Sequence, residues 1–288
     1  MGSAFAEDTA VHRVDTGRYR ASLSSAWNLL PLPQGGVITA IAARAMTTEL
    51  DDGSQRLRSL HTTFVSQVTD GPLAVEVETL RRGRSMSHLR ADVHNEGARS
   101  GHVTTAAYGS ARRGFSFDDL DPPAAPPPDQ CASWRTPPPP GVEGFTPMPF
   151  WSEQVEGRTV HGHAPWEDFE PGRAETVMWY GFDETPWLDD GTVDPLAMVV
   201  LVDTMPGSIR EKLGRLAPAR WFSPSIDLTV HLFGPCRSPW VLARSRTRHA
   251  DDGYASAEMA VWDCGTSGTE TPRLVAYGTQ VFVFTFPD

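Results

Sequence analysis

The sequence predicts an α+β protein made of two similar units, each with one buried helix followed by four antiparallel strands. Two observations support this prediction. The order of one helix and four strands occurs twice along the 288 residues, and short stretches of the first unit reappear in the second. We therefore expect two copies of one unit fused in a single chain, at residues 18–113 and 174–288.

In the first unit, Gly35-Gly36 precedes an apolar run at residues 37–46. The apolar residues cover almost the whole circumference of a helix, which indicates that this helix is buried. Four runs with the composition and alternation of strands follow. They span residues 57–68, 73–82, 87–94 and 102–110.

In the second unit, Asp194 is a suitable N-cap and Pro195 a suitable first residue for a helix that runs to Asp203. Pro206 ends or kinks this helix. The strands expected after it span residues 225–233, 240–248, 254–262 and 274–286.

The repeat is visible in individual residues. Residues 107–111 (AYGSA) correspond to residues 276–280 (AYGTQ), and residues 59–63 (SLHTT) correspond to residues 225–229 (SIDLT). The two helices align when Gly36 is set opposite Leu196 and Ala43 opposite Asp203. In this alignment Thr63 and Thr229 agree, whereas Ala111 stands opposite Gln280.

A proline-rich segment, residues 114–173, connects the two units. Thirteen of the 25 prolines lie between Pro122 and Pro171, and such a stretch cannot join a helix or the interior of a sheet. We expect the segment to wrap the surface or to cover a site. His161 and His163 lie near its end, and a loop is favoured there over a metal site because no further ligands accompany them.

The composition excludes several classes of protein. The formal net charge of -11 argues against a nucleic-acid-binding protein, which needs clustered cations. Lys212 is the only lysine, which excludes a P-loop. Its polar surroundings also argue against Schiff-base chemistry.

The sequence also predicts a soluble, cytoplasmic location. The longest apolar run, residues 196–202, is far shorter than the roughly 20 residues of a membrane span. The N-terminus lacks the basic start and apolar stretch of a signal peptide. The three cysteines form no CxxC pair, so we expect neither a disulfide framework nor a zinc site built on cysteines. They are Cys131, Cys236 and Cys264.

The ordered set of these features resembles the double-hotdog acyl-CoA thioesterases of the TesB-like type. The resemblance rests on Gly-Gly before the first helix, residues 57–64 (LRSLHTTF), residues 75–85 (VEVETLRRGRS) and an Asp in the second helix. It covers about residues 18–112 and 175–286. It implies a double hotdog, in which each of two fused repeats wraps an antiparallel sheet around a central helix, and a role in lipid metabolism.

The two units differ where the resemblance places the chemistry. The first unit has Gly35 and Gly36 but Ala43 where a carboxylate is expected, and the second has Asp203 but Pro195 where the glycines are expected. Thioester hydrolysis needs donors near a developing oxyanion and a group that activates water. The two units would therefore form one complete site and one inactive site.

By similarity to the family's trio of Asp, Thr or Ser, and Gln, we expect Asp203 to act as the base or nucleophile. Thr229 and Gln280 would orient the water and hold the carboxylate, and Gly36, preceded by Gly35, would donate a backbone N–H to the oxyanion. Each residue has a structural alternative. Asp203 could cap a loop, Thr229 could reflect strand propensity, Gln280 could face outward and Gly36 could serve only as a tight helix entry.

The expected reaction is hydrolysis of an acyl-CoA to a free acid and CoA, without a metal or cofactor, with the acyl chain in an apolar tunnel. Trp27 is expected in the core rather than in the tunnel wall. An acyl carrier protein could take the place of CoA, and exposed sheet edges would allow a homodimer. The phosphates of CoA would need a local patch of arginines, and the candidates are Arg81, Arg82, Arg84 and Arg90.

Two other functions stay open at this point. A hotdog enoyl-CoA hydratase or dehydratase pairs an Asp with a His, and His231 is expected on the same strand face as Thr229. A non-catalytic hotdog protein that binds an acyl thioester is the second alternative.

Overall fold

The computed structural model describes residues 2–29, 31–142, 148–164, 166–218, 221–265 and 271–286. Its helices are α1 (Ala4–Asp8), α2 (Gly35–Leu50), α3 (Pro195–Val202) and α4 (Ile209–Leu213). Single turns of other helix types are η1 (Ser25–Trp27), η2 (Pro128–Gln130), η3 (Phe150–Gln154), η4 (Met205–Ser208) and η5 (Gly214–Leu216). Among the described residues, no helix is both long enough and apolar enough to span a membrane.

The strands before the connecting segment are β1 (His12–Asp15), β2 (Arg18–Leu23), β3 (Arg56–Phe64), β4 (Gly71–Arg81), β5 (Met86–Asn95) and β6 (His102–Gly109). The later strands are β7 (Ala132–Ser133), β8 (Val155–His161), β9 (Glu175–Phe182), β10 (Asp227–Leu232), β11 (Trp240–Asp251), β12 (Tyr254–Asp263) and β13 (Arg273–Val283). Every strand and both long helices expected from the sequence are present, with ends within four residues of the expected ones.

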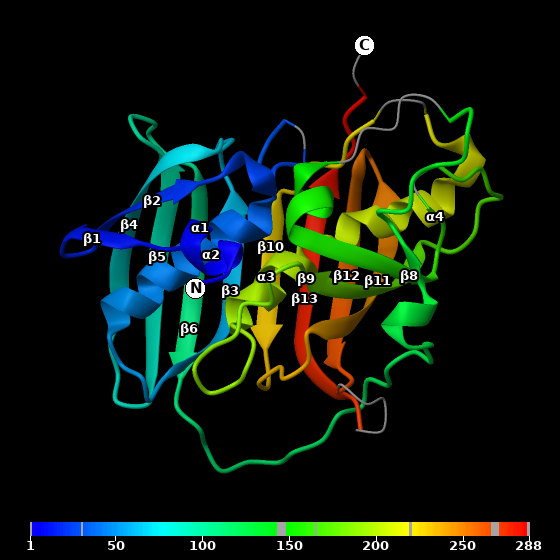
Figure 1. Cartoon of the computed structure of the whole chain (residues 1–288). Coiled ribbons are helices and arrows are strands. Elements are labelled where there is room, and N and C mark those ends of the chain that lie inside the picture. Colours follow the sequence, from blue (N-terminus) through cyan, green and yellow to red (C-terminus); the bar gives the residue numbers. More distant parts are fainter. Residues whose placement is uncertain are drawn as a thin grey trace.

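The described strands form one antiparallel sheet in the order β1-β2-β4-β5-β6-β3-β10-β13-β12-β11-β9-β8-β7. The first unit makes up one side of this sheet and the second unit the other, and α2 and α3 lie next to each other against the same face (Figure 1). This arrangement confirms the double-hotdog fold.

Strands β3 and β10 join the two units. They are the corresponding strands of the two repeats and pair antiparallel, with Thr62 opposite Leu228. Because both residues are fully buried, the core side of one unit continues into the core side of the other. The two halves therefore share one hydrophobic core.

Helix α2 is buried along almost its whole length, as its apolar circumference predicts. Trp27, just before α2, is also fully buried. Its indole N–H donates to Asp8 at 2.8 Å, and its ring contacts those of Phe150 and Phe182. The prediction that Trp27 belongs to the core is confirmed.

The two central helices run antiparallel and touch where α2 begins and α3 ends. A Cβ atom on Gly36 would lie 2.9 Å from the carbonyl oxygen of Val199 and from the Cα atom of Val200. No side chain fits at that distance, so the glycine is needed for the close approach of the two backbones.

The connecting segment contributes more to the sheet than its composition predicts. Strand β8 lies inside residues 114–173 and pairs with both β7 and β9. The expectation that this segment stays out of the sheet is wrong for residues 132–133 and 155–161. The physical reason is local, because neither stretch contains a proline and every backbone N–H in them is available.

The matched sequences of residues 107–111 and 276–280 do not occupy equivalent positions in the structure. Tyr108 faces the core and donates to the carbonyl oxygen of Ala43 at 3.0 Å, whereas Tyr277 bonds to Glu258 on the other face of the sheet. Ala111 is exposed beyond the end of β6, while Gln280 is buried within β13. The alignment of Ala111 with Gln280 is therefore wrong, since an odd shift along a strand exchanges its two faces.

Replacing Gly36 by Ala should destabilise the fold. The added methyl group must displace backbone atoms of α3, and overpacking of this kind typically costs about 1–3 kcal/mol in the free energy of unfolding. Chemical denaturation of the variant measures this loss. Gly53→Ala is the control, because no heavy atom lies within 4 Å of its added Cβ, and equal stability of the two variants would contradict the close-approach role of Gly36.

Candidate active site

Asp203 lies between the ends of the two central helices. It directly follows the last residue of α3 and is only 7% exposed. Its Oδ2 atom accepts the backbone N–H of Gly36, in the first turn of α2, at 2.8 Å. A carboxylate from the second unit thus caps the helix of the first, where the partial positive charge of the helix N-terminus favours a negative group.

Gln280 holds the other carboxylate oxygen. Its Nε2 donates to Asp203 Oδ1 at 2.5 Å and to the hydroxyl oxygen of Ser225 at 2.7 Å. Gln280 is 2% exposed, so the outward-facing alternative is wrong. Its Oε1 atom is buried and has no hydrogen-bond partner among the described residues. The site therefore contains one buried acceptor that is available to a ligand or water.

The surroundings of Asp203 change its acidity. Burial raises the pKa of this carboxyl to about 7, while the hydrogen bonds from Gln280, Gly36 and Gly35 act in the opposite direction. Burial dominates because the charged form loses its hydration. A carboxylate with a pKa near neutrality is a far stronger base than an ordinary aspartate.

Gln34 connects the same two helix ends from the other side. As the N-cap of α2, its Oε1 accepts the N–H of Val37 at 2.9 Å. Its Nε2 donates to the carbonyl oxygen of Val200 at 2.8 Å. One buried side chain thus satisfies a free donor of α2 and a free acceptor of α3. This fixes the position of the backbone that faces Asp203.

Gly35 provides the space in front of the carboxylate. A Cβ atom there would lie 2.9 Å from the ring of Phe64 and 3.1 Å from Asp203 Oδ2. Phe64 comes from the end of β3 and also contacts the buried ring of His102, at 4.7 Å between centroids. Asp203 is therefore approached by the first turn of α2 and by an aromatic wall from the first unit.

Thr229 does not join this group. Its hydroxyl bonds to His61 Nδ1 at 2.9 Å, on the face of β10 opposite to the buried Leu228 and Val230. The expected placement of Thr229 beside Asp203 is therefore a misassignment. Ser225 occupies the position next to Gln280 instead.

An irregularity of β10 explains this difference. Thr229 pairs with Thr279, but Ser225 bridges to Phe282, one residue short of the regular register. Between them, Asp227 turns its carboxylate to accept the N–H of Val281 at 2.7 Å. An extra residue of this kind exchanges the faces of a strand. The only signal in the sequence was that Ser225 begins the repeated SIDLT stretch.

Gly36 has a different partner from the expected one. Its N–H, assigned from the sequence to the thioester oxyanion, donates to Asp203. The alternative of a tight helix entry describes part of its role, since no side chain fits there. In this state of the protein the donor is engaged by the carboxylate.

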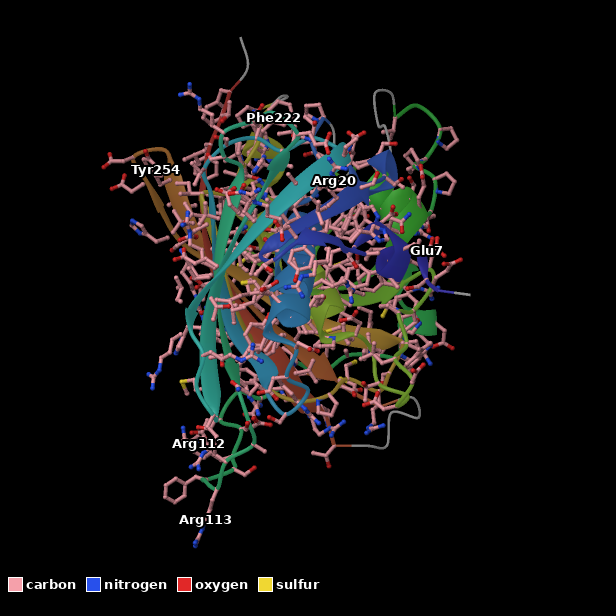
Figure 2. All side chains as sticks on the ribbon, turned by 90° about the vertical axis from the view of Figure 1, so that its left-hand side faces the viewer. Glu7, Arg20, Arg112, Arg113, Phe222 and Tyr254 are labelled. Atoms are coloured by element: carbon pink, nitrogen blue, oxygen red, sulfur yellow. The ribbon has the colours of Figure 1, made fainter. Side chains whose placement is uncertain are left out.

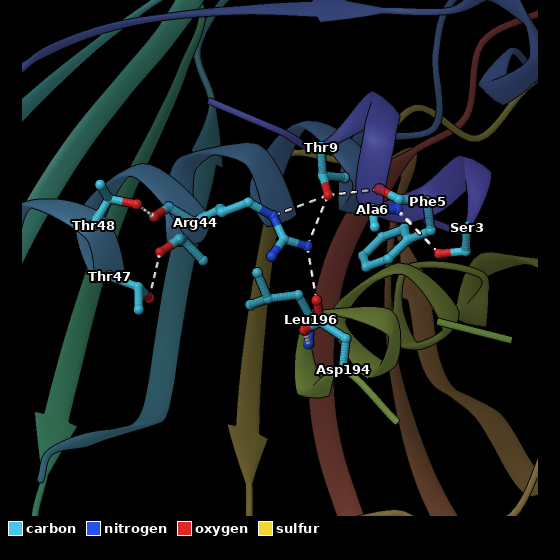
Figure 3. Close-up of polar contacts among 10 residues, drawn as sticks. Ser3, Phe5, Ala6, Thr9, Arg44, Thr47, Thr48, Asp194 and Leu196 are labelled. Atoms are coloured by element: carbon cyan, nitrogen blue, oxygen red, sulfur yellow. Dashed lines mark hydrogen bonds and ion pairs between the residues drawn. The ribbon is translucent and has the colours of Figure 1, made fainter. Parts of the chain in front are cut away.

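The other end of the helix pair, where α3 begins beside Arg44 of α2, has different contacts (Figure 3). Arg44 donates to Thr9 and forms an ion pair with Asp194 at 2.8 Å. Asp194 also caps its own helix by accepting the N–H of Leu196 at 2.9 Å. Leu196 is the residue aligned with Gly36. The carboxylate beside Leu196 is therefore paired with a cation, whereas the Asp203 carboxylate beside Gly36 is not paired with one in the described part of the chain.

The remaining candidates lie away from Asp203. Arg82 donates to the carbonyl oxygen of Leu50 at 2.7 Å, which places the arginine turn at the far end of α2, about 20 Å from Gly36 at 1.5 Å per residue. His231 shares the exposed face of Thr229. The Asp–His pair of a hydratase is therefore not formed with this histidine.

The two histidines of the connecting segment do not form a metal cluster. His163 bonds to the buried Glu211 at 2.7 Å and stacks on Phe169 at 3.7 Å. In the described ranges, no group of three or more His, Cys, Asp or Glu side chains could hold a metal ion.

The same fold is found in solved structures. A conserved protein with a hot dog fold from Alicyclobacillus acidocaldarius is 21% identical, with a TM-score of 0.81 and full coverage of both chains. The acyl-CoA thioesterase II TesB2 of Mycobacterium marinum is 22% identical, with a TM-score of 0.73 and 99% of each chain covered. The tesB protein of Mycobacterium avium subsp. paratuberculosis is 18% identical, with a TM-score of 0.74 and 98% of each chain covered. No curated protein matches the chain in sequence.

Two family models match the sequence. The acyl-CoA thioesterase N-terminal domain matches residues 23–112, and the acyl-CoA thioesterase C-terminal domain matches residues 128–284. The second match begins inside the connecting segment, before the added strands β7 and β8. The chain thus belongs to the TesB-like acyl-CoA thioesterase family.

Proposed function

We propose that this protein hydrolyses an acyl-CoA thioester to a free acid and CoA, with Asp203 as the base. The observation that carries the proposal is the buried carboxylate of Asp203, held at 2.8 Å by the first turn of α2 and at 2.5 Å by Gln280. No cation neutralises it among the ion pairs of the described residues. Membership of the thioesterase family supports the same reaction.

The first step needs a base that is charged at neutral pH and able to hold a proton. With its pKa raised to about 7, Asp203 meets both conditions. We assign it to take a proton from water while the oxygen of that water adds to the thioester carbon. The alternative mechanism is direct attack of the Asp203 carboxylate on the thioester carbon. It gives an anhydride and uses the same ionised group.

Gln280 and Ser225 are positioning residues in this proposal. The Gln280 amide N–H groups are shared between the Asp203 carboxylate and the Ser225 hydroxyl. Its unpartnered Oε1 can accept a hydrogen bond from the attacking water. Ser225 therefore takes the role that the sequence assigned to Thr229.

The first turn of α2 supplies stabilisation for the oxyanion. A protonated carboxyl is a weaker acceptor than a carboxylate, so transfer of the proton to Asp203 loosens its hold on the Gly36 N–H. This donor, with Gly35 before it, is then available to a tetrahedral oxyanion that lies beside the carboxyl group. Collapse of the intermediate breaks the carbon–sulfur bond, and the proton on Asp203 passes to the departing thiolate.

Asp203→Asn should lower kcat by about 10²–10⁴, because it removes the base and keeps the shape of the side chain. Release of free thiol from acyl-CoAs of different chain length, followed with a thiol-reactive dye, measures this loss. The thermal unfolding curve of the variant is the control for folding. Unchanged turnover in a folded variant would remove Asp203 from the mechanism.

The pH dependence should follow the raised pKa of Asp203. The base acts in its deprotonated form, so kcat/KM should rise with pH around a midpoint near 7 instead of near 4. The residual activity of Asp203→Asn should lack this rise. A midpoint near 4 in the wild-type protein would show that a solvated carboxyl is the base.

Ser225→Ala and Thr229→Ala form a matched pair. The first removes the hydroxyl that holds Gln280, and should lower kcat by about tenfold, the loss of one buried hydrogen bond. The second removes a hydroxyl on the other face of β10 and should leave kcat within twofold of the wild type. The opposite result would restore Thr229 as the third member of the site.

A further inference from the structure

A groove of about 520 Å³ lies at the edge of the second unit, where α4 faces the end of β11. Its lining is rich in cations. They come from the segment just before β9, from α4 and from β11, and comprise Arg173, Lys212, Arg246 and Arg248. We call this feature the basic groove. It contains the only lysine of the chain.

The charges of the basic groove are only partly neutralised. Glu175 is the one carboxylate in its lining, and it pairs with Arg246 at 2.9 Å. Arg248 pairs with Glu258 of the neighbouring strand. Arg173 and Lys212 take part in none of the side-chain hydrogen bonds or ion pairs of the described residues, and both are exposed. Two cations are therefore available to an anion.

The basic groove is close to the candidate active site without being part of it. Gln280 pairs with Ala257, and Ala257 pairs with Thr247, which lines the groove. Two strand spacings separate Gln280 from Thr247, which is about 10 Å. The chain also connects the two places directly, since Asp203 leads through η4 into Ile209 and Lys212 of α4.

Other cationic surfaces fit a phosphate-rich substrate less well. The turn with Arg81, Arg82 and Arg84 lies at the far end of α2. A second groove, about 290 Å³, has Arg18 and Arg90 in its lining but also three carboxylates. These are Glu76, Glu78 and Asp92.

We propose that the basic groove binds the phosphates at the adenosine end of an acyl-CoA whose thioester lies at Asp203. This inference rests on the proposed function. The diphosphate and the 3′-phosphate of CoA are the charged part of the molecule, and arginine and lysine are the side chains that recognise phosphate. The uncharged arm between phosphate and sulfur is long and flexible enough to span the distance to Gln280. The groove also provides a local positive field on a chain with a net charge of -11.

The test compares two double variants on two substrates. Arg173→Ala with Lys212→Ala removes the two cations that have no partner. Arg112→Ala with Arg113→Ala is the matched control, because these exposed arginines lie at the opposite end of the molecule from the hairpin tip with Tyr254 (Figure 2). The substrates are an acyl-CoA and the same acyl group on N-acetylcysteamine, which has no phosphate.

The groove variant should raise KM for the acyl-CoA by about tenfold, the size expected for two partly exposed phosphate contacts. The KM for the N-acetylcysteamine thioester should stay the same, and the control variant should resemble the wild type on both substrates. An unchanged KM for the acyl-CoA, or an equal loss on both substrates, would overturn the proposal.

Binding measured without turnover separates this inference from the proposed function. Calorimetric titration with CoA and with adenosine 3′,5′-bisphosphate at low salt should give a Kd about tenfold weaker for the groove variant, and added salt should weaken wild-type binding. If no thioester is hydrolysed but this difference in Kd is found, the proposed function fails and the groove assignment stands. If thioesters are hydrolysed and the Kd values are equal, the groove assignment fails alone.

Discussion

The contact between the Asp203 carboxylate and the first turn of α2 is the interaction on which the arrangement of the two units depends. It joins the C-terminal end of one helix to the N-terminal end of the other. Gln34 makes a second link between the same ends. Because Gly36 has no side chain, the two backbones can approach closely enough for these bonds to form. The pairing of β3 with β10 joins the cores of the two units, and this junction brings the residues of the candidate site together.

The duplicated fold offers two such junctions, and only one has the carboxylate that the proposed mechanism needs. At one end a carboxylate without a cation faces the helix N-terminus. At the other, Asp194 caps its own helix and its charge is balanced by Arg44. The oxygens of Asp194 are thus occupied by a helix N–H and by a guanidinium. Both junctions therefore link the two units, and the Asp203 junction is the one whose carboxylate has no cation beside it among the described residues.

The sequence predicted the fold, the fusion of two units and four of the residues that meet at the junction, because these depend on period and order. The four are Asp203, Gln280, Gly35 and Gly36. The sequence-based assignment misplaced Thr229. The extra residue near Asp227 exchanges the two faces of β10, and no local sequence pattern indicates it. The alignment of Ala111 with Gln280 failed for a related reason, because similar short sequences can place their residues on opposite faces of a strand. Strand β8 was missed because composition was averaged over a segment whose prolines lie outside residues 155–161.

The pKa of Asp203 results from two opposing effects, burial and hydrogen bonding, and neither helix supplies both. Burial at the end of α3 disfavours the charged form, and the N–H groups of α2 with the Gln280 amide favour it. With burial alone the group would stay protonated and could not accept a proton. With full hydration it would be an ordinary weak base. In the proposed mechanism, a carboxylate that is active near neutrality therefore requires both units. This requirement is a physical reason for keeping two hotdog repeats in one chain with different residues at equivalent positions.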